Sequence, residues 1–183
     1  MTEEHLIRHC SPTLAGLKTG SLFTCTLENK QALLCSMGQL NRRLKSKGLR
    51  LIPLRFSENR ALIYLYRPKL LQSDLAGEAV SALMVRQGYC PQDCQQCINM
   101  LIQKLRMAPE FPHEIGLFLG YPPEDVQGFM ENKACGCKCV GCWKVYGDVD
   151  KAQKTFERYE KCTRIFCRAY EKGSSLEGLA KSS

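Results

Sequence analysis

The sequence predicts an α+β protein with a small, mainly antiparallel sheet of about three to four strands and a helical C-terminal half. Short runs rich in Leu, Ile, Phe, Thr and Tyr precede residue 68 and predict strands. Apolar residues at spacings of three and four dominate the later chain and predict helices. With 183 residues and a 44% apolar content, the chain can bury a core. We expect one domain over residues 1–173 and a mobile tail, rich in Ser and Lys, over residues 174–183.

The N-terminal segment gives a weak signal, and clearer elements follow it. Residues 1–20 show no clear periodicity, and Ser11-Pro12 suggests a turn. In Ser21–Thr26, Leu22, Thr24 and Thr26 alternate with Phe23 and Cys25, which predicts a short strand. A helix is predicted from about Asn29 to Lys47, because apolar residues at spacings of four, three and four fall on one face and a glycine follows.

Two further strands are predicted to form a hairpin. They are Leu49–Phe56 and Ala61–Arg67, joined by four polar or charged residues. Pro53 cannot donate a main-chain hydrogen bond, so its strand should lie at a sheet edge or carry a bulge. Trp143–Tyr146 is a candidate fourth strand of the same sheet.

Helices are predicted over most of the remaining chain. Their approximate ranges are Ser73–Gln87, Pro91–Met107, Pro112–Gly120, a segment that starts at Pro122, and Asp148–Tyr170. Cys94 shares the apolar face of the second of these helices and Cys97 lies beside it, so core packing is favoured over metal binding for both thiols.

Cysteine content and the N-terminus together bear on the compartment. The chain has twelve cysteines, an N-terminus without the basic start and apolar core of a signal peptide, and no run of about 20 apolar residues that would span a membrane. We therefore expect a cytoplasmic protein without a membrane segment. Structural disulfides are disfavoured there, which leaves core thiols, metal ligands or redox thiols.

The clearest candidate metal site is a group of four cysteines within eight residues. They are Cys135, Cys137, Cys139 and Cys142. Thiolates bind zinc tetrahedrally or hold iron–sulfur clusters, and the last two have the Cys-x-x-Cys spacing of a zinc knuckle. Weaker candidate ligands are Cys162, Cys167, His9 and Cys10. The alternative is that the first three thiols share one side of an extended chain and face the core.

The candidate acid–base and stacking groups lie in the same region. His113 and Glu114 stand where a short helix begins, and the pattern is not the His-Glu-x-x-His of zinc proteases. Such an acid commonly compensates a helix dipole, and such a histidine commonly makes a structural hydrogen bond. Trp143 and Tyr146 are candidates for stacking on a base or flavin ring, although aromatic strand residues more often pack in a core.

A basic stripe is predicted on the last helix. It consists of Lys151, Lys154, Arg158, Lys161, Arg164 and Arg168, spaced by three or four residues. With a formal net charge of +8, the chain is suited to nucleic acid or another acidic macromolecule. The alternative is an ordinary solvated face, since Glu157 and Glu160 flank the stripe.

Long motifs connect the chain to a known family. These are Pro112-His-Glu-Ile-Gly-Leu-Phe-Leu-Gly-Tyr-Pro122, Cys142-Trp-Lys-Val-Tyr146, His9-Cys10, Pro12-Thr-Leu14 and the Leu49–Tyr66 hairpin. With them the chain resembles, over nearly its whole length, the bacterial family catalogued as domain of unknown function 3793. The resemblance implies no activity, cofactor or catalytic residue.

The sequence therefore supports a ranked set of functional hypotheses. The first is a cytoplasmic accessory protein that binds zinc or an iron–sulfur cluster, or exchanges electrons with a redox partner, through the thiols of residues 135–142. The second is a binding module for nucleic acid or an acidic protein through the basic stripe. An enzyme with His113 and Glu114 is the third, and no nucleophile–base–orienter set identifies a reaction.

Overall fold

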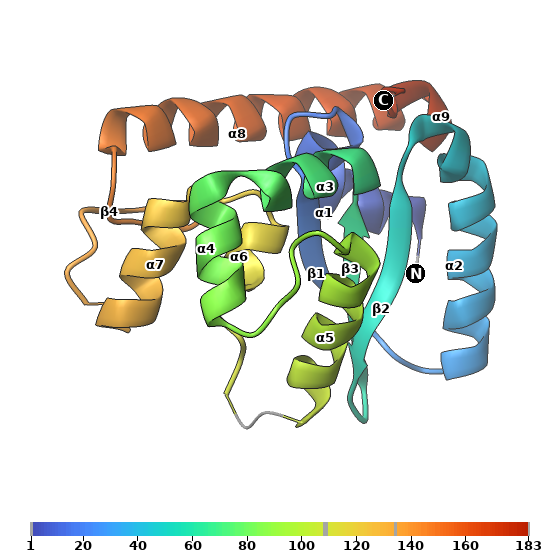
Figure 1. Cartoon of the computed structure of the whole chain (residues 1–183). Helices are drawn as coiled ribbons and strands as arrows, with labels where there is room; N and C mark the ends of the chain where they lie inside the picture. The colour runs from blue at the N-terminus through green and yellow to red at the C-terminus, as the bar shows by residue number, and fades with distance from the viewer. Residues whose placement is uncertain (1, 108–109, 134, 183) are drawn as a thin grey trace. The chain divides into compact units, whose positions relative to one another are not determined.

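The computed structural model describes residues 2–107, 110–133 and 135–182, whose helices and strands are labelled in Figure 1. Contacts divide the chain into two compact units. One comprises Met1–Leu70 with Lys161–Ser183, and the other comprises Leu71–Glu160. Our prediction of one domain over residues 1–173 stays a prediction, because two such units can belong to a single domain.

The first unit is built on a three-stranded antiparallel sheet, so the α+β prediction is confirmed. Its strands are β1 (Gly20–Thr26), β2 (Arg50–Phe56) and β3 (Arg60–Tyr66), in the spatial order β1-β3-β2. The predicted hairpin of β2 and β3 is present. Pro53 lies in the edge strand, and the register shifts between Pro53 and Arg55, as expected where a residue cannot donate to the ladder.

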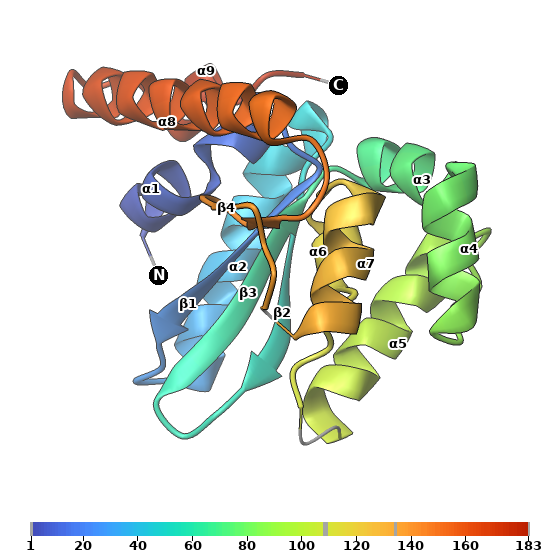
Figure 2. The ribbon, with the colours of Figure 1, turned by 90° about the vertical axis from the view of Figure 1, so that its left-hand side faces the viewer.

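One face of this sheet forms the core of the first unit with helices α1 (Glu3–Leu14) and α2 (Lys30–Leu44). Figure 2 shows α2 running along the strands. Phe23 of β1 lies opposite Ile63 of β3 in the sheet register, and both side chains are buried in this core. Alternation along the strands places Phe23, Cys25, Ala61, Ile63 and Leu65 in this core, and Tyr64 and Tyr66, on the opposite side of β3, are buried as well.

Helix α2 buries the stripe that its spacing predicts. The buried residues are Leu33, Met37, Leu40 and Leu44. At its start, the Asn29 side chain accepts a hydrogen bond of 3.0 Å from the main-chain N–H of Ala32. A 3-10 turn, η1 (Lys45–Lys47), follows, and Gly48 ends it with a φ of 70°. This left-handed conformation suits glycine, so the predicted stop is confirmed.

The N-terminal segment is a helix, and the predicted turn at Ser11-Pro12 is wrong. Helix α1 contains Pro12 in its last turn, where the absent N–H costs only one hydrogen bond. The helix is held by one buried face, formed by Leu6, Ile7, Cys10 and Leu14. Tertiary burial of this face outweighs the local turn signal of the proline.

A buried arginine connects distant parts of the first unit. Arg67 directly follows β3 and is 2% exposed. Its guanidinium donates hydrogen bonds of 2.7–3.1 Å to main-chain carbonyl oxygens, those of Thr13, Leu14, Lys47 and Lys181. Burial lowers the pKa of Arg67. The guanidinium thus fixes the ends of α1 and η1 and the C-terminal segment around one point.

The C-terminal segment, predicted as a mobile tail over residues 174–183, contains the short helix α9 (Leu176–Leu179). Leu176 and Ala180 are buried in the core of the first unit. The main-chain N–H of Lys181 donates to the carbonyl oxygen of Leu14 at 3.0 Å. Leu176 and Ala180 therefore pack the described part of this Ser- and Lys-rich segment against the core of the first unit.

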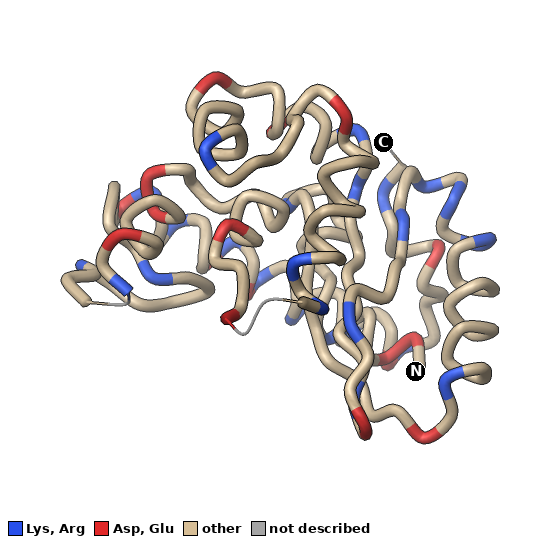
Figure 3. Tube along the Cα trace, turned by 60° about the horizontal axis from the view of Figure 1, so that its bottom comes forward, with Lys and Arg blue, Asp and Glu red and all other residues tan. Residues whose placement is uncertain are grey.

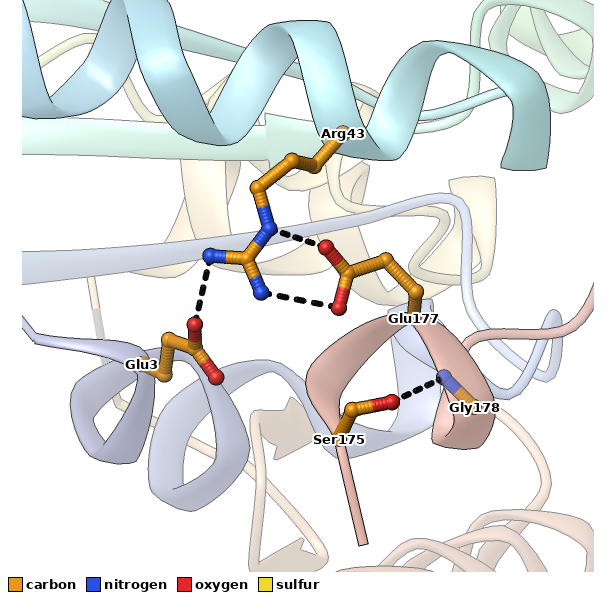
Figure 4. Close-up of polar contacts among 5 residues, drawn as sticks. All are labelled: Glu3, Arg43, Ser175, Glu177 and Gly178. Atoms are coloured by element: carbon orange, nitrogen blue, oxygen red, sulfur yellow. Dashed lines mark hydrogen bonds and ion pairs between the residues drawn. The ribbon is translucent and has the colours of Figure 1, made fainter.

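An ion-pair cluster joins three helices of the first unit (Figure 4). Arg43 of α2 binds the Glu177 carboxylate through Nε and, at 2.8 Å, through Nη2. Its Nη1 donates to Glu3 of α1 at 2.6 Å. The hydrogen bonds from Arg43 lower the pKa of Glu177. Because these side chains are partly exposed, water screens the cluster.

The second unit is mainly helical. Its helices are α3 (Pro68–Ala76) from Leu71 onward, α4 (Glu78–Arg86), α5 (Cys94–Met107), α6 (Ile115–Phe118), α7 (Pro123–Asn132) and the part of α8 (Val149–Glu171) up to Glu160. The single helix predicted over Ser73–Gln87 is wrong, because the segment contains two helices separated at Gly77. The backbone of Gly77 is extended there, with φ −61° and ψ 135°.

The predicted fourth strand does not join the main sheet. Lys144–Val145 (β5) pairs instead with Cys139–Val140 (β4) in a separate antiparallel hairpin. The two strands are close in sequence, so their pairing closes only a short loop and costs little chain entropy. The prediction identified an extended segment correctly and assigned it the wrong partner.

Candidate functional site

The candidate site of the second unit is built from the corner between α6 and α7 and from the β4–β5 hairpin. Gly120 ends α6 with a φ of 74°, and Pro123 stands at the start of α7. A Cβ atom on Gly116 would lie 2.7 Å from Cγ2 of Val126. The close approach of α6 and α7 therefore depends on glycine at position 116.

A buried carboxylate attaches the hairpin to α7. Asp125 is 3% exposed. Its Oδ2 accepts a hydrogen bond of 2.7 Å from the indole Nε1 of Trp143, and its Oδ1 accepts from the main-chain N–H groups of Tyr146 at 2.7 Å and Gly147 at 2.8 Å. Three donors compensate the desolvation of this carboxylate. Asp125 is thereby committed to positioning the indole and the end of the hairpin.

A cavity of about 270 Å³ lies beside this anchor, close to the lower end of the range of about 300–1,000 Å³ for small-molecule sites. Its lining residues are mainly apolar and aromatic. They are Phe111, His113, Ile115, Gly116, Tyr121, Asp125, Val126, Phe129, Cys142, Trp143 and Lys144. A cavity of this size and lining suits a small ring compound.

The aromatic rings of the cavity contact one another. The Tyr121 and Trp143 rings stack with centroids 4.7 Å apart, and the His113 ring meets the Phe129 ring edge-on at 4.8 Å. Phe156 of α8 packs edge-on against the indole, with ring centroids 4.5 Å apart. Such pairs hold ring orientations more firmly than burial alone. The indole in particular is fixed by Tyr121, Phe156 and Asp125.

Polar atoms reach the cavity from a few side chains. His113 and Cys142 are exposed, and Lys144 is half-buried with its Nζ 5.8 Å from the centroid of the Phe129 ring. Imidazole, thiol and ammonium groups here would meet the polar end of a ligand whose ring occupies the apolar part. Two candidates that the sequence named separately, His113 and Trp143, therefore line the same cavity.

The other two candidates of that region lie elsewhere. Tyr146 is not among the lining residues of the cavity and packs over Gly128, where a Cβ atom would lie 2.5 Å from the tyrosine ring. Glu114 is 5% exposed, and its Oε1 accepts from Lys104 Nζ at 2.7 Å and from the Tyr89 hydroxyl at 3.1 Å. Glu114 thus belongs to a buried ion pair. Burial of Tyr89 and, to a smaller extent, the negative charge of Glu114 raise the pKa of Tyr89.

The four clustered thiols lie at the surface rather than in the core. Cys135 and Cys142 are exposed, and Cys137 and Cys139 are half-buried. The alternative that they face the core is therefore wrong for this segment. Within the described residues, no three or more His, Cys, Asp or Glu side chains are grouped so that they could hold a metal ion.

The weaker candidate ligands belong mostly to packing. Cys10 and Cys162 are buried, and burial raises the pKa of both thiols. The ring of His9 stacks on Phe23, with centroids 5.7 Å apart. Cys167 is half-buried and packs against the core of the first unit. All four residues are part of the first unit, whereas residues 135–142 are part of the second.

The basic stripe of α8 faces solvent. Lys151, Lys154, Arg158, Lys161, Arg164 and Arg168 are all exposed. Figure 3 shows the basic and acidic residues along the trace, which include a second basic run, Arg42 to Arg50, without an acidic residue. In the described part of the chain, none of the helices has the length and apolarity needed to cross a lipid bilayer.

The sequence matches the profile of the family described as "Protein of unknown function (DUF3793)" over residues 6–180. The chain belongs to the DUF3793 family. Searches of the curated proteins and of the solved structures gave no match. The function of this DUF3793 member is therefore inferred from the geometry of its site.

Sequence reasoning named only His113, Cys142 and Trp143 among the residues that line the cavity of this DUF3793 protein. Asp125 stands in the first turn of α7, where an acid commonly compensates the helix dipole, whereas it anchors the hairpin through Trp143. Phe129 and Lys144 were not named, although both line the cavity. One signal was present in the sequence: Val126 and Phe129 lie three residues apart on the apolar side of α7, directly after the Asp.

Proposed function

We propose that this protein binds a small, flat ring compound in the aromatic cavity of its second unit. The observation that supports this proposal best is the convergence of His113, Tyr121, Phe129 and Trp143 on one mainly apolar cavity. Rigid aromatic walls bind a flat ring at low entropic cost, because few rotors are immobilised. The proposal concerns binding and names no reaction.

The charge at the cavity favours a ligand with an acidic group. Lys144 and His113 supply basic side chains to the lining, and both carboxylate oxygens of Asp125 accept hydrogen bonds from the indole and two main-chain N–H groups. An aromatic carboxylate or a phosphorylated ring compound would therefore place its ring against Trp143 and its anion near Lys144.

Trp143 supplies the test, since it is the only tryptophan of the chain. Titration with nicotinate, indole-3-acetate and flavin mononucleotide should change its fluorescence saturably for at least one compound, with a Kd below about 1 mM. Calorimetric titration separates binding from optical absorption by the ligand. The absence of a saturable signal with all three probes would count against the proposal.

A pair of ligands and a pair of variants test the role of charge. Lys144→Gln should weaken nicotinate binding about tenfold and leave nicotinamide binding nearly unchanged, because only the acid uses the ammonium charge. Lys133→Gln, an exposed lysine outside the lining, is the matched control and should change neither affinity. Equal losses for both ligands in Lys144→Gln would contradict the charge argument.

We propose metal binding by the thiols of residues 135–142 as a second function. The supporting observation is their accessibility, since these thiols are exposed or half-buried and are not used by the core. Zinc or an iron–sulfur cluster would have to draw them together by rearranging this segment, because the described residues hold no preformed group of three. In this proposal the protein acts in the reducing cytoplasm, next to a redox partner.

The metal proposal is tested on protein purified without oxygen. Elemental analysis should find close to one equivalent of zinc or a cluster's iron, and Cys139→Ser with Cys142→Ser should remove it. Cys35→Ser, which changes an exposed thiol outside the group, should retain the metal. Less than about a tenth of an equivalent in the unmodified protein argues strongly against metal binding.

The basic stripe of α8 remains a proposal for contact with nucleic acid or an acidic protein, supported by the exposure of its six cations. It predicts retention on heparin with a steep dependence on salt. Changing Lys154, Arg158 and Lys161 to Gln should shorten that retention more than the same change of Arg42, Lys45 and Arg50. If both triple substitutions shortened heparin retention equally, the retention would depend on net charge and not on the basic stripe.

A further inference from the structure

A second group of cysteines lies at the start of α5 in the second unit, independent of the cavity. Cys94 is the first residue of this helix and Cys97 stands one turn later, in a Cys-x-x-Cys arrangement. Residues three apart in a helix are neighbours on its surface, with Cβ atoms about 5–6 Å apart. Cys94 is half-buried, whereas Cys97 is buried, so one thiol is open to solvent and its neighbour is covered.

The loop before the helix fixes the buried thiol. The Sγ of Cys97 donates to the carbonyl oxygen of Cys90 at 3.1 Å, and the main-chain N–H of Asp93 donates to the same oxygen at 3.0 Å. The Asp93 carboxylate in turn accepts the N–H of Gln96 at 2.9 Å and caps the helix. Cys97 is therefore held against the loop, one helical turn from Cys94, before any reaction occurs.

We propose that Cys94 and Cys97 form a reversible dithiol–disulfide site that exchanges with small-molecule disulfides such as oxidised glutathione. The Cys94 thiolate attacks one sulfur of the external disulfide, forms a mixed disulfide and releases one thiolate. The Cys97 thiolate then attacks the Cys94 sulfur, closes the internal disulfide and releases the second thiolate. The protein loses two electrons and two protons, and the external disulfide becomes two thiols.

The surroundings determine how this site behaves. Burial, with the neighbouring thiols Cys94 and Cys90, raises the pKa of Cys97 to about 11, and burial also raises the pKa of Cys94. Few thiolates are present at neutral pH, so exchange is slow, and no stabilised thiolate opposes the disulfide once it has closed. Closure also removes the hydrogen bond from Cys97 to Cys90, which loosens the loop ahead of α5.

The test uses the full chain in glutathione buffers of graded composition, followed by alkylation in acid and tryptic mass spectrometry. Cleavage at Arg86 and Lys104 gives one peptide that contains all three thiols. We expect this peptide to lose two hydrogen atoms, with the disulfide between Cys94 and Cys97 and with Cys90 alkylated. The internal disulfide should exceed the mixed disulfide at Cys94 by about tenfold or more, because the second thiol is tethered nearby.

Variants separate the proposal from general thiol oxidation. Cys94→Ser should abolish closure, and Cys90→Ser should leave it intact. Cys35, an exposed thiol on α2, should form only the mixed disulfide. Replacement of buried Cys97 risks unfolding, so the decisive variants are those at positions 94 and 90. A persistent mixed disulfide at Cys94, or a disulfide of Cys97 with Cys90, would overturn the assignment.

Discussion

Arg67 is buried in the first unit and Asp125 in the second, and these two charged side chains have different roles. Arg67 in the first unit donates to carbonyl oxygens from α1, η1 and the C-terminal segment. Asp125 in the second unit accepts from an indole and from two N–H groups of one hairpin. The arginine joins segments more than a hundred residues apart, whereas the carboxylate orients a neighbouring hairpin at a cavity. The first contact should therefore control stability, and the second should control the shape of the site.

The largest expected effect is that of Arg67→Met. The substitution leaves several buried carbonyl oxygens without their donor, so we expect a loss of about 3–5 kcal/mol in the free energy of unfolding. Urea denaturation followed by circular dichroism measures it. Arg60→Met, at an exposed position of β3, is the control and should cost less than about 0.5 kcal/mol. Similar losses in both variants would show that the hydrogen bonds to Arg67 contribute little.

The next effect is that of Asp125→Ala. Loss of the acceptor frees the indole of Trp143 and the end of the hairpin, so we expect about 2–3 kcal/mol of destabilisation, a red shift of tryptophan emission and loss of ligand binding. Asp150→Ala, at an exposed position of α8, is the control and should cost about 0.5 kcal/mol. Unchanged emission in Asp125→Ala would contradict the assigned role of the carboxylate.

Glu114 is a third buried charge, and its partner is an opposite charge. Glu114 is 6% exposed at its side chain and binds Lys104, which is 26% exposed. We expect Glu114→Gln to cost about 1–3 kcal/mol and the double variant with Lys104→Gln to cost less than the sum of the two single changes. Additive effects in this double-mutant cycle would show that the pair is not coupled. Nicotinate affinity should stay unchanged, since neither residue lines the cavity.

The smallest effect concerns the ion-pair cluster of the first unit. Hydrogen bonds from Arg43 lower the pKa of Glu177 below its ordinary value of 4.5. Its contribution to stability is therefore present above pH 4.5 and is lost as the pH falls through the lowered value. Because Arg43 is 42% exposed, we expect no more than about 1 kcal/mol, reduced by salt. Arg43→Gln should flatten the difference in stability between pH 7 and pH 3.

Local patterns in the sequence predicted much of the first unit and less of the candidate site. The spacing of Leu33, Met37 and Leu40 identified α2, and Pro53 identified the edge strand. The first feature depends only on neighbours in sequence, and the second depends only on the fact that proline cannot donate a main-chain hydrogen bond. Pairing partners were harder: Trp143–Tyr146 was assigned to the wrong sheet, because alternation identifies a strand without naming its neighbour.

The candidate site was predicted in pieces. His113 and Trp143 were named for separate reasons, and their meeting at one cavity depends on the α6–α7 corner and on Asp125. A carboxylate in the first turn of a helix has the same sequence signal whether it faces solvent or accepts a buried indole. The thiols of residues 135–142 likewise form a recognisable motif in the sequence, but their spacing does not show whether the backbone brings the sulfur atoms together.

The involvement of Lys181 and Leu176 in the first unit has a consequence for biosynthesis. A growing chain exposes residues 71–160 before it makes the segment that completes the core around Leu14. On the ribosome, residues 71–160 can therefore fold while the core of residues 1–70 still lacks the C-terminal segment that covers it. Residues 1–70 can close only after residues 176–181 have left the ribosome, so the order of maturation runs against the order of translation.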